Sequence, residues 1–405
     1  MPANLVVQKY GGTSLATTDR IVQVARRIAR SREAGNRVLV VVSAMGETTD
    51  ELLALASRIT AAPAARELDM LLTAGERVSM ALLSMALHEL GHAAVSYTGS
   101  QSGIITDTRH ADARILEVRA TRLEEALGQE RVAIVAGFQG VSAEREVTTL
   151  GRGGSDTTAV ALAAALGAQR CEICTDVDGV CSADPRRVPR ATQLLAISYD
   201  EMLELAAHGA GVLHPRCVEV ARRFHVPLEV RSSFTNAKGT VIGPMERIET
   251  AVIRGIACDE NVATVTLRDL VPDAALDLLA ALGEADIATR LVVQTDHAMR
   301  CDLVFLLPRT DAARAVSVLE STGDAARGRV ELDDDVAALS VVGQGIQSQP
   351  GTVARVLRAL RDAGVHVRVV SSSAISVTCV VQRGIADRAL QALHTALGLD
   401  ATAAE

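Results

Sequence analysis

Residues 148–168 read TTLGRGGSDTTAVALAAALGA, a glycine-rich turn that runs directly into an alanine-rich helix. Glycines let the backbone adopt positive φ and approach a ligand closely, and the first free amides of a helix attract negative charge. Arg152 adds a planar guanidinium suited to a carboxylate or a phosphate, and Ser155 and Asp156 begin the helix. The stretch predicts an anion site that also contains an acid. An ordinary strand-to-helix turn is the alternative, because a lone glycine cluster does not separate the two.

A second glycine turn lies near the N-terminus. The apolar residues 5–7 predict a short strand, which delivers Lys9 to a glycine turn and then to a helix from about residue 19 to 32. A strand, a lysine, a glycine turn and a helix together favour a phosphate site. The lysine precedes the glycines, so the pattern is not a Walker A motif, and a solvated lysine at a strand end is the alternative. The turn consists of Gly11, Gly12, Thr13 and Ser14.

Strands and helices alternate along residues 5–234. The run VLVVV at 38–42 is continuously apolar, as expected of a parallel strand that is covered on both faces. Further strands are predicted near 131–136, 172–175 and 227–230, with helices between them. This alternation predicts an α/β fold with a mostly parallel sheet sandwiched by helices. Two hydroxyls, Ser43 and Thr49, follow strand 38–42 at its carboxyl end, where open α/β sheets bind ligands.

An acidic residue interrupts a predicted apolar helix over residues 69–90. Glu76 follows Gly75 in the middle of this helix. Unpaired acids are seldom buried, so Glu76 is expected either to meet the ammonium group of a ligand or to form a salt bridge with a neighbouring arginine. The sequence leaves both interpretations open.

Polar residues also follow the strand predicted at 172–175. That strand ends in Thr175 and Asp176, and a turn with Asp184 and Arg186 comes next. Acids at the end of a strand suit a nucleotide with its magnesium ion. A simple Asp-Gly turn is the alternative, since such turns are common.

The pattern changes after residue 240. We predict a catalytic domain over 1–240, a linker over 241–248 and a regulatory region over 249–405. The regulatory region contains two small units in tandem, at about 260–330 and 335–405, with a βαββαβ-like order of elements. This order predicts ferredoxin-like α+β modules that sense small molecules, and neither module carries an obvious catalytic residue.

The composition argues against several classes of partner. The formal net charge of -8, the aromatic fraction of 2% and the lack of tryptophan argue against nucleic acid. We find no uncharged apolar window of about 18 residues and no signal-peptide pattern, so we expect a cytoplasmic protein without a membrane partner. The cysteines are too sparse for a disulfide framework, and Cys171 and Cys174 lack a second pair at ligand spacing, so no metal site is predicted.

Several motifs occur in order along the chain. They are KYGGTS at 9–14, SAMGETTDELL at 43–53, LLTAGERVS at 71–79, GFQG at 137–140, TTLGRGGSDTTA at 148–159, TDVDGV at 175–180 and ADPR at 183–186. One such motif is weakly specific, but the ordered set covers nearly the whole chain. Together the motifs resemble those of aspartate kinase, a family of the amino-acid-kinase superfamily with a kinase domain and two C-terminal ACT domains.

The resemblance implies transfer of the γ-phosphate of ATP, with Mg²⁺, to the side-chain carboxylate of L-aspartate. The product, 4-phospho-L-aspartate, leads toward lysine, threonine and methionine. A carboxylate has an ordinary pKa of about 4, so the nucleophile arrives ionised and needs no general base. By resemblance, Lys9 stabilises the transferring phosphoryl group and Asp156 holds Lys9 in place.

The resemblance also assigns the remaining site residues. Substrate-binding residues are Arg152 for a carboxylate, Glu76 for the ammonium group, and the hydroxyls of Ser43, Thr49 and Ser155. Nucleotide-binding residues are Gly11, Gly12, Thr13, Ser14, Thr175, Asp176, Cys181, Asp184, Arg186 and Gly211. An amino-acid effector is assigned to Gln294, Gln349, His366 and Val367.

The chain departs from the family pattern in three places. Cys181 replaces a usual tyrosine, and Gly211 replaces a lysine that meets the ATP phosphates. In the first module Leu-Val-Pro-Asp at 270–273 replaces the Asp-x-Pro-Gly effector turn, whereas the second module keeps Gln-Pro-Gly at 349–351. Three interpretations stay open: an aspartate kinase with altered feedback, a kinase for a related amino-acid carboxylate, and a catalytically weak partner subunit that binds effectors.

Paired ACT domains imply association between subunits. We expect a homo-oligomer, or a heterotetramer with a regulatory subunit that starts internally near Met245. The small-molecule partners expected from the resemblance are L-aspartate, MgATP and an amino-acid effector.

Overall fold

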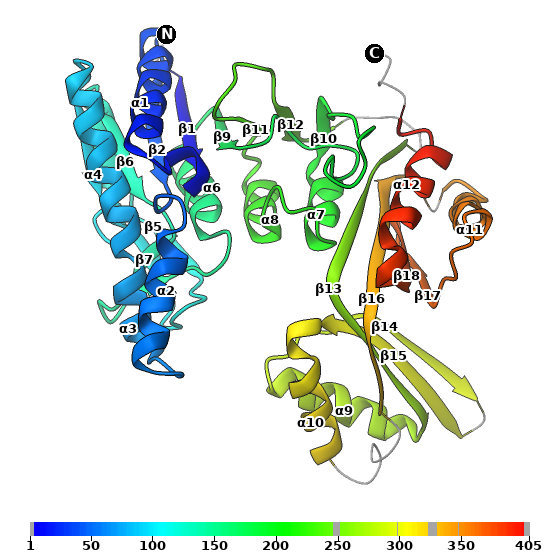
Figure 1. Cartoon of the computed structure of the whole chain (residues 1–405). Helices are drawn as coiled ribbons and strands as arrows, with labels where there is room; N and C mark the ends of the chain where they lie inside the picture. Colours follow the sequence, from blue (N-terminus) through cyan, green and yellow to red (C-terminus); the bar gives the residue numbers. More distant parts are fainter. Residues whose placement is uncertain (1–3, 246–251, 298, 323–329, 347, 401–405) are drawn as a thin grey trace. The chain divides into compact units, whose positions relative to one another are not determined.

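The computed structural model describes residues 4–245, 252–297, 299–322, 330–346 and 348–400 (Figure 1). The chain divides into two compact units. The first comprises the described residues of Met1–Val180, Gln193–Ala206 and Gly211–Arg247, and the second those of Cys181–Thr192, Ala207–Ala210 and Ile248–Glu405. The domain boundaries predicted from the sequence stay a prediction, because residues 246–251 lie outside the described residues.

The first unit is built on an eight-stranded sheet with the order β10-β12-β11-β9-β1-β2-β6-β3. Its pairs are parallel except for β11 with β12, which confirms the predicted mostly parallel sheet. The strands are β1 (Leu5–Tyr10), β2 (Arg37–Val42), β3 (Ala94–Tyr97), β6 (Val132–Ala136), β9 (Arg170–Thr175), β10 (Ala196–Ser198), β11 (Leu228–Ser232) and β12 (Thr240–Gly243).

Helices cover both faces of this sheet. Alternate residues of a strand face opposite sides, and Val38, Val40 and Val42 of β2 lie in one core cluster with Ile28 of α1 and Leu83 of α4. The alanine-rich α6 packs against β1, β2 and β9 instead. The helices of the unit are α1 (Thr18–Glu33), α2 (Thr48–Ile59), α3 (Ala65–Leu72), α4 (Ala74–Glu89), α5 (Thr121–Gly128), α6 (Gly154–Ala165), α7 (Tyr199–Ala207) and α8 (Pro215–Phe224), with a 3₁₀ turn at Gly12–Leu15.

A four-stranded sheet with the order β5-β4-β7-β8 completes the first unit. Its strands are β4 (Ile104–Thr106), β5 (Ile115–Val118), β7 (Gln139–Ser142) and β8 (Val147–Thr149). The last strand runs directly into the glycine turn at 150–153, so this small sheet fixes where that turn begins.

The helix predicted over residues 69–90 is wrong in one respect, because the chain forms α3 and α4 with a break at Thr73. Gly75 therefore lies in the first turn of α4, where a Cβ would come within 2.7 Å of the Ala44 Cβ. The combined stretch Ala65–Glu89 is long and apolar enough to cross a membrane by length and composition alone, and 44% of an apolar 18-residue segment within it is buried. A core helix passes the same test, and Leu83 and Leu87 of this stretch are fully buried.

The second unit contains one six-stranded sheet with the order β14-β15-β13-β16-β18-β17. Its elements are β13 (Val252–Leu270), α9 (Pro272–Glu284), β14 (Arg290–His297), β15 (Arg300–Pro308), α10 (Ala312–Ser321), β16 (Val330–Gln344), α11 (Thr352–Asp362), β17 (Val369–Ser372), β18 (Ser376–Gln382) and α12 (Ala386–Ala396), with 3₁₀ turns at Arg309–Asp311 and Arg383–Ile385. Helices and strands thus form the expected α+β modules.

The two long strands β13 and β16 pair antiparallel with each other and are the two central strands of this sheet. The length of β13 is not evident from the sequence, because the polar residues around Asp259 and Glu260 interrupt the apolar pattern. The ladder shows register shifts at that point and continues beyond it. One core cluster includes Phe305 with α9 and α10, and another includes Leu339 with α11 and α12.

The segment 181–192 packs within the second unit. Ala183 and Val188 are buried in the core cluster that also contains Leu339 and Leu393. The hydroxyl of Ser182 lies 2.8 Å from Nε2 of the fully buried His394. This segment therefore contributes core residues to the unit that α11 and α12 cover.

Candidate active site

The loops that follow β1, β2 and β6 meet at the carboxyl ends of these strands. The Ser43 amide donates to the Tyr10 carbonyl over 3.1 Å, and the Gly137 amide donates to the Val42 carbonyl over 2.9 Å. Gly12 allows the first two loops to approach, because a Cβ at this position would lie 3.0 Å from the Gly46 carbonyl oxygen. The predicted ligand edge of the sheet is therefore a closely packed set of turns.

The glycine turn at 150–153 enters α6 through two left-handed glycines. Gly151 has φ +71° and Gly153 has φ +68°. Gly153 is the N-cap of α6 and has no side chain to bond the first amides. The Gly154 amide donates to the Gly151 carbonyl over 3.0 Å, and no side chain among the described residues caps the amides that follow, which suits an anionic ligand. A Cβ at Gly153 would lie 2.2 Å from the His214 Cβ, so the turn tolerates only glycine there.

Lys9 and Asp156, the two residues predicted to be catalytic, form an ion pair. The Lys9 Nζ lies 2.6 Å from the Asp156 Oδ1, and each side chain is 12% exposed. Lys9 comes from the end of β1, and Asp156 comes from the first turn of α6, where the helix dipole favours a negative charge. Limited exposure weakens screening by water, so this pair is a fixed charge arrangement beside the free amides of α6.

Glu76 is buried beside these turns with only part of its carboxylate satisfied. Its side chain is 3% exposed, and its Oε1 accepts from the Ala44 amide over 3.1 Å. Its Oε2 has no hydrogen-bond partner among the described residues, so the salt bridge to a neighbouring arginine is not formed. Burial raises the pKa of Glu76 to about 7, against the lowering effect of its backbone hydrogen bonds. A ligand ammonium group would satisfy the unpartnered oxygen.

The other predicted substrate residues surround the same turns. Arg152 is exposed and forms no ion pair with any residue in the described part of the chain. Ser155 is buried in the first turn of α6, within 2.8 Å of where a Cβ on Gly137 would lie. Ser43 and Thr49, after β2, are half-buried. Their contacts with substrate stay predictions.

The first glycine turn adjoins the end of β9. The Gly11 amide donates to the Cys174 carbonyl over 3.4 Å, and Ser14 donates to the Ser233 hydroxyl over 2.8 Å. The Ser233 amide in turn donates to the Thr175 carbonyl over 2.8 Å. The structure thus brings Gly11, Ser14 and Thr175 together, with Asp176 following and its Oδ1 3.0 Å from the Thr175 hydroxyl. The sequence did not single out Ser233, because the two adjacent serines at 232 and 233 match no ligand-binding motif.

The remaining nucleotide residues divide between the units. Gly211 belongs to the first unit, is exposed, and has open space where a Cβ would be. Cys181, Asp184 and Arg186 belong to the second unit. Arg186 forms an ion pair with Asp184 at 2.8 Å, and its hydrogen bonds lower the pKa of that carboxyl.

The predicted effector residues also lie in the second unit. Gln294 is exposed on β14 and donates to Asp296 over 2.9 Å. Gln349 precedes α11 and accepts from the Thr352 amide over 3.3 Å. His366 and Val367 follow the opposite end of α11. The four residues therefore do not form one cluster around a single end of that helix.

Two residues that sequence reasoning missed support the glycine turn. His214 caps α8, accepting from the Arg216 amide, and burial lowers its pKa although Asp156 acts in the opposite direction. Arg216 is 11% exposed at its side chain and donates to the Leu150 carbonyl over 2.9 Å. The sequence His-Pro-Arg marks a helix start and nothing more.

The described residues contain no group of three or more His, Cys, Asp or Glu side chains that could hold a metal. Cys171 and Cys174 are buried on β9, where burial raises the pKa of both thiols. A lone carboxylate such as Asp176 fits Mg²⁺ that arrives with phosphates, because this ion keeps several waters and needs one or two protein carboxylates.

The parallel sheet, the paired glycine turns and the buried ion pair define a small-molecule kinase of the amino acid kinase type. The family model for the amino acid kinase family matches residues 4–232, and the model for the ACT domain matches residues 339–397.

Similar proteins indicate which family of amino acid kinases the chain belongs to. An aspartokinase of Corynebacterium efficiens is 50% identical over 402 residues, covering 96% of this chain and 95% of its own. An aspartokinase of Mycolicibacterium smegmatis is 48% identical over 405 residues, covering 98% and 96%. The crystal structure of E. coli aspartokinase III in complex with aspartate and ADP (R-state) has a TM-score of 0.84 at 26% identity, covering 97% of this chain and 99% of that one. The chain belongs to the aspartokinases of the amino acid kinase family.

Proposed function

We propose that the chain transfers the γ-phosphoryl group of ATP to the side-chain carboxylate of L-aspartate, giving 4-phospho-L-aspartate. The observation that carries this proposal is the Lys9–Asp156 ion pair, 2.6 Å long, at the open N-terminus of α6. Its relatives support the choice of substrates, since the solved structure of E. coli aspartokinase III is a complex with aspartate and ADP.

The chemistry requires positioning and charge neutralisation. The aspartate carboxylate is ionised at neutral pH, so no general base is needed. Lys9 neutralises charge on the transferring phosphoryl group, and Asp156 keeps the ammonium group of Lys9 oriented. The free amides of α6 stabilise negative charge at the same place. Asp156 is therefore an organiser of the site.

Recognition of the amino acid needs one group for each of its charges. The unpartnered Oε2 of Glu76 would accept from the substrate ammonium group. The unpaired guanidinium of Arg152 would bind a substrate carboxylate in a bidentate manner. Ser43, Thr49 and Ser155 would supply hydroxyl groups around the substrate.

The nucleotide is assigned to the turn Gly11–Ser14 and to the end of β9, at Thr175 and Asp176. Mg²⁺ bound to ATP would supply charge neutralisation on the phosphates, with Asp176 as the carboxylate that would hold it. Roles for Cys181, Asp184, Arg186 and Gly211 stay predictions from the resemblance.

Regulation and assembly form the finer part of the proposal. An amino-acid effector would bind near the turn at 349–351, which the second ACT module retains. The chain would act as a homo-oligomer, or as a heterotetramer with a subunit that starts near Met245. The altered turn at 270–273 favours a specialised paralogue with changed feedback. Its cytoplasmic localisation stays a prediction.

ADP release by the purified chain, with L-aspartate, ATP and Mg²⁺, tests the proposal. We expect turnover that saturates with aspartate, is trapped as the hydroxamate and disappears in Lys9→Ala. Turnover with another amino acid but not with aspartate would favour the related carboxylate kinase. Failure to bind ATP, together with binding of an amino acid, would favour the partner subunit.

A further inference from the structure

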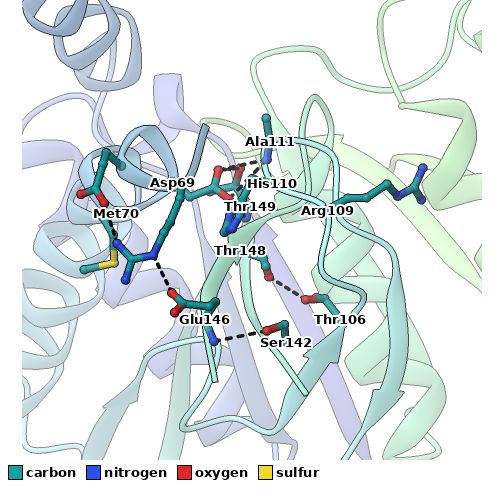
Figure 2. Close-up of polar contacts among 12 residues, drawn as sticks. Asp69, Met70, Thr106, Arg109, His110, Ala111, Ser142, Glu146, Thr148 and Thr149 are labelled. Carbon is teal, nitrogen blue, oxygen red and sulfur yellow. Dashed lines mark hydrogen bonds and ion pairs between the residues drawn. The ribbon is translucent and has the colours of Figure 1, made fainter. Parts of the chain in front are cut away.

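A buried carboxylate outside the residues assigned to substrate joins three segments of the first unit (Figure 2). Asp69 of α3 is 0% exposed. Its Oδ1 accepts from the Thr149 hydroxyl over 2.6 Å and from the Ala111 amide over 3.1 Å. Its Oδ2 accepts from the Thr149 amide over 3.2 Å and lies 2.7 Å from the His110 Nδ1. A buried carboxylate with this many donors is costly to disturb.

The segments that Asp69 joins continue along the chain to two residues assigned to the substrate, Glu76 and Arg152. Along the chain, α3 continues through Thr73 into the first turn of α4, which carries Glu76. On the other side, Thr149 is the last residue of β8 and is followed by the turn that carries Arg152. Asp69 is thus bonded to the strand end that precedes the carboxylate-binding residue, and it lies seven positions before the ammonium-binding residue.

The loop at 107–114 bonds both to Asp69 and to the end of β8. The Ala113 amide donates to the Thr149 carbonyl over 2.9 Å, and a Cβ at Gly151 would lie 3.0 Å from the Ala111 carbonyl oxygen. Arg216 donates to the carbonyls of Leu150 and Ala113 over 2.9 and 2.5 Å. The residues that begin the glycine turn are therefore bonded to this loop and to Arg216, and Asp69 connects the loop and β8 with α3.

We propose that Asp69, through its bonds to Thr149 and Ala111, is a positioning residue that sets the relative positions of Glu76 and Arg152. The two residues must match the fixed spacing between the ammonium and carboxylate groups of one amino acid. A small displacement of either costs affinity for that substrate. Among the described residues, the bonds of the Asp69 carboxylate go to His110, Ala111 and Thr149, and none goes to the nucleotide turns at Gly11–Ser14 and at the end of β9. We therefore expect the effect on the amino acid and not on ATP. This inference rests on the proposed function.

Two adjacent threonines offer a matched test. Thr149 is directed to Asp69, whereas its neighbour Thr148 is directed to Thr106, with 2.6 Å between the two hydroxyls (Figure 2). Both threonines are buried on β8, and each loses one hydrogen bond when it is replaced by valine. Thr149→Val therefore cuts a bond to Asp69, Thr148→Val controls for the loss of a buried hydroxyl, and Thr149→Ser restores the bond.

Initial rates should be measured for the full chain and these variants, with each substrate varied in turn. We expect Thr149→Val to raise KM for aspartate about tenfold and to leave KM for ATP within about twofold. Thr149→Ser should restore KM for aspartate, and Thr148→Val should leave it unchanged at a similar loss of Tm. An unchanged KM for aspartate in Thr149→Val, or an equal rise in Thr148→Val, would overturn the inference.

Hydrogen exchange separates this inference from the proposed function. We expect faster exchange of the amides at 149–154 in Thr149→Val than in Thr148→Val, whichever amino acid is the substrate. Equal exchange in the two variants would overturn the positioning role. A wild-type chain without turnover on aspartate would instead contradict the proposed function, and the exchange measurement would still decide the role of Asp69.

Discussion

The helices α6 and α11 begin in the same way but in different surroundings. Each has a left-handed glycine at its N-cap, Gly153 with φ +68° and Gly351 with φ +92°, and neither has a side-chain cap. A Cβ on Gly153 would collide with His214, whereas a Cβ on Gly351 would meet nothing within 4 Å. The first turn of α6 contains an acid paired with Lys9, and the first turn of α11 contains no acid.

The backbone alone therefore does not determine what a helix N-terminus does. Both turns expose amides that can bind an anion. The turn at α6 is enclosed and carries fixed charges, which suits the stabilisation of charge that develops during a reaction. Gly351 at the start of α11 is exposed and the first turn of that helix contains no acid, which suits reversible binding of a small effector.

Removing the charge at the enclosed turn should have the largest effect. Lys9→Ala leaves Asp156 buried without its cation and removes the group that neutralises the phosphoryl charge. We expect kcat to fall by about 10³-fold. The matched control is Lys238→Ala, which removes an exposed lysine from the same unit. Steady-state ADP release measures both, and a loss below about tenfold in Lys9→Ala would contradict the assigned role.

Alanine at each N-cap glycine tests the comparison directly. Gly153→Ala combines an unfavourable φ with a clash at 2.2 Å, so it should lower the free energy of unfolding by about 3 kcal/mol and abolish most activity. Gly351→Ala has only the unfavourable φ and should cost about 1 kcal/mol. Denaturant unfolding and activity measure both effects. Equal losses in the two variants would show that enclosure by His214 is irrelevant.

The pH dependence of aspartate binding should follow Glu76. Its pKa of about 7 lies above the ordinary value for glutamate, so the carboxylate that accepts the substrate ammonium group is lost as pH falls below 7. We expect kcat/KM for aspartate to fall toward tenfold per pH unit below that value. The same burial makes Glu76 favour the folded state at low pH, and this stability is lost as pH rises from about 4.5 to 7.

Glu76→Gln is the control for this pH profile. It keeps the size of the side chain and removes the titration, so the fall of kcat/KM below pH 7 should vanish while kcat/KM itself is low throughout. A variant with an unchanged pH profile would assign the titration to another group.

The smallest effect on activity is expected from a substitution at Gly211, an exposed glycine of the first unit. Gly211→Lys adds a cation at an exposed position with no atom within 4 Å of the new Cβ. If this position faces the phosphates, KM for ATP should fall on the order of threefold, the size typical of exposed charge pairs. Gly128→Lys is the control, because a Cβ at Gly128 would also meet no atom within 4 Å. Gly167 also has open space, but its φ of +59° would strain any other residue. An equal change of KM for ATP in both variants would contradict the assignment of Gly211 to the nucleotide site.

The sequence predicted the elements that local pattern determines. The apolar run of β2, the turn after Lys9 and the glycine at 153 all follow from residue types and spacing. The contact between Asp69 and Thr149 did not follow, because the two residues are 80 positions apart and a single acid on an amphipathic helix resembles a solvated one. The break at Thr73 was missed because helix-forming residues lie on both sides of it.

The path of residues 181–192 has a consequence for any separately made regulatory polypeptide. A chain that started at Met245 would lack Ala183 and Val188, which fill the core beside Leu339 and Leu393. It would also lack the hydroxyl that meets the buried His394. Such a fragment would present an uncovered apolar surface, and the Nε2 of His394 would lose its partner although Nδ1 keeps its bond to Asp400 at 2.6 Å. Another surface would have to take the place of the missing segment to cover the core beside Leu339 and Leu393.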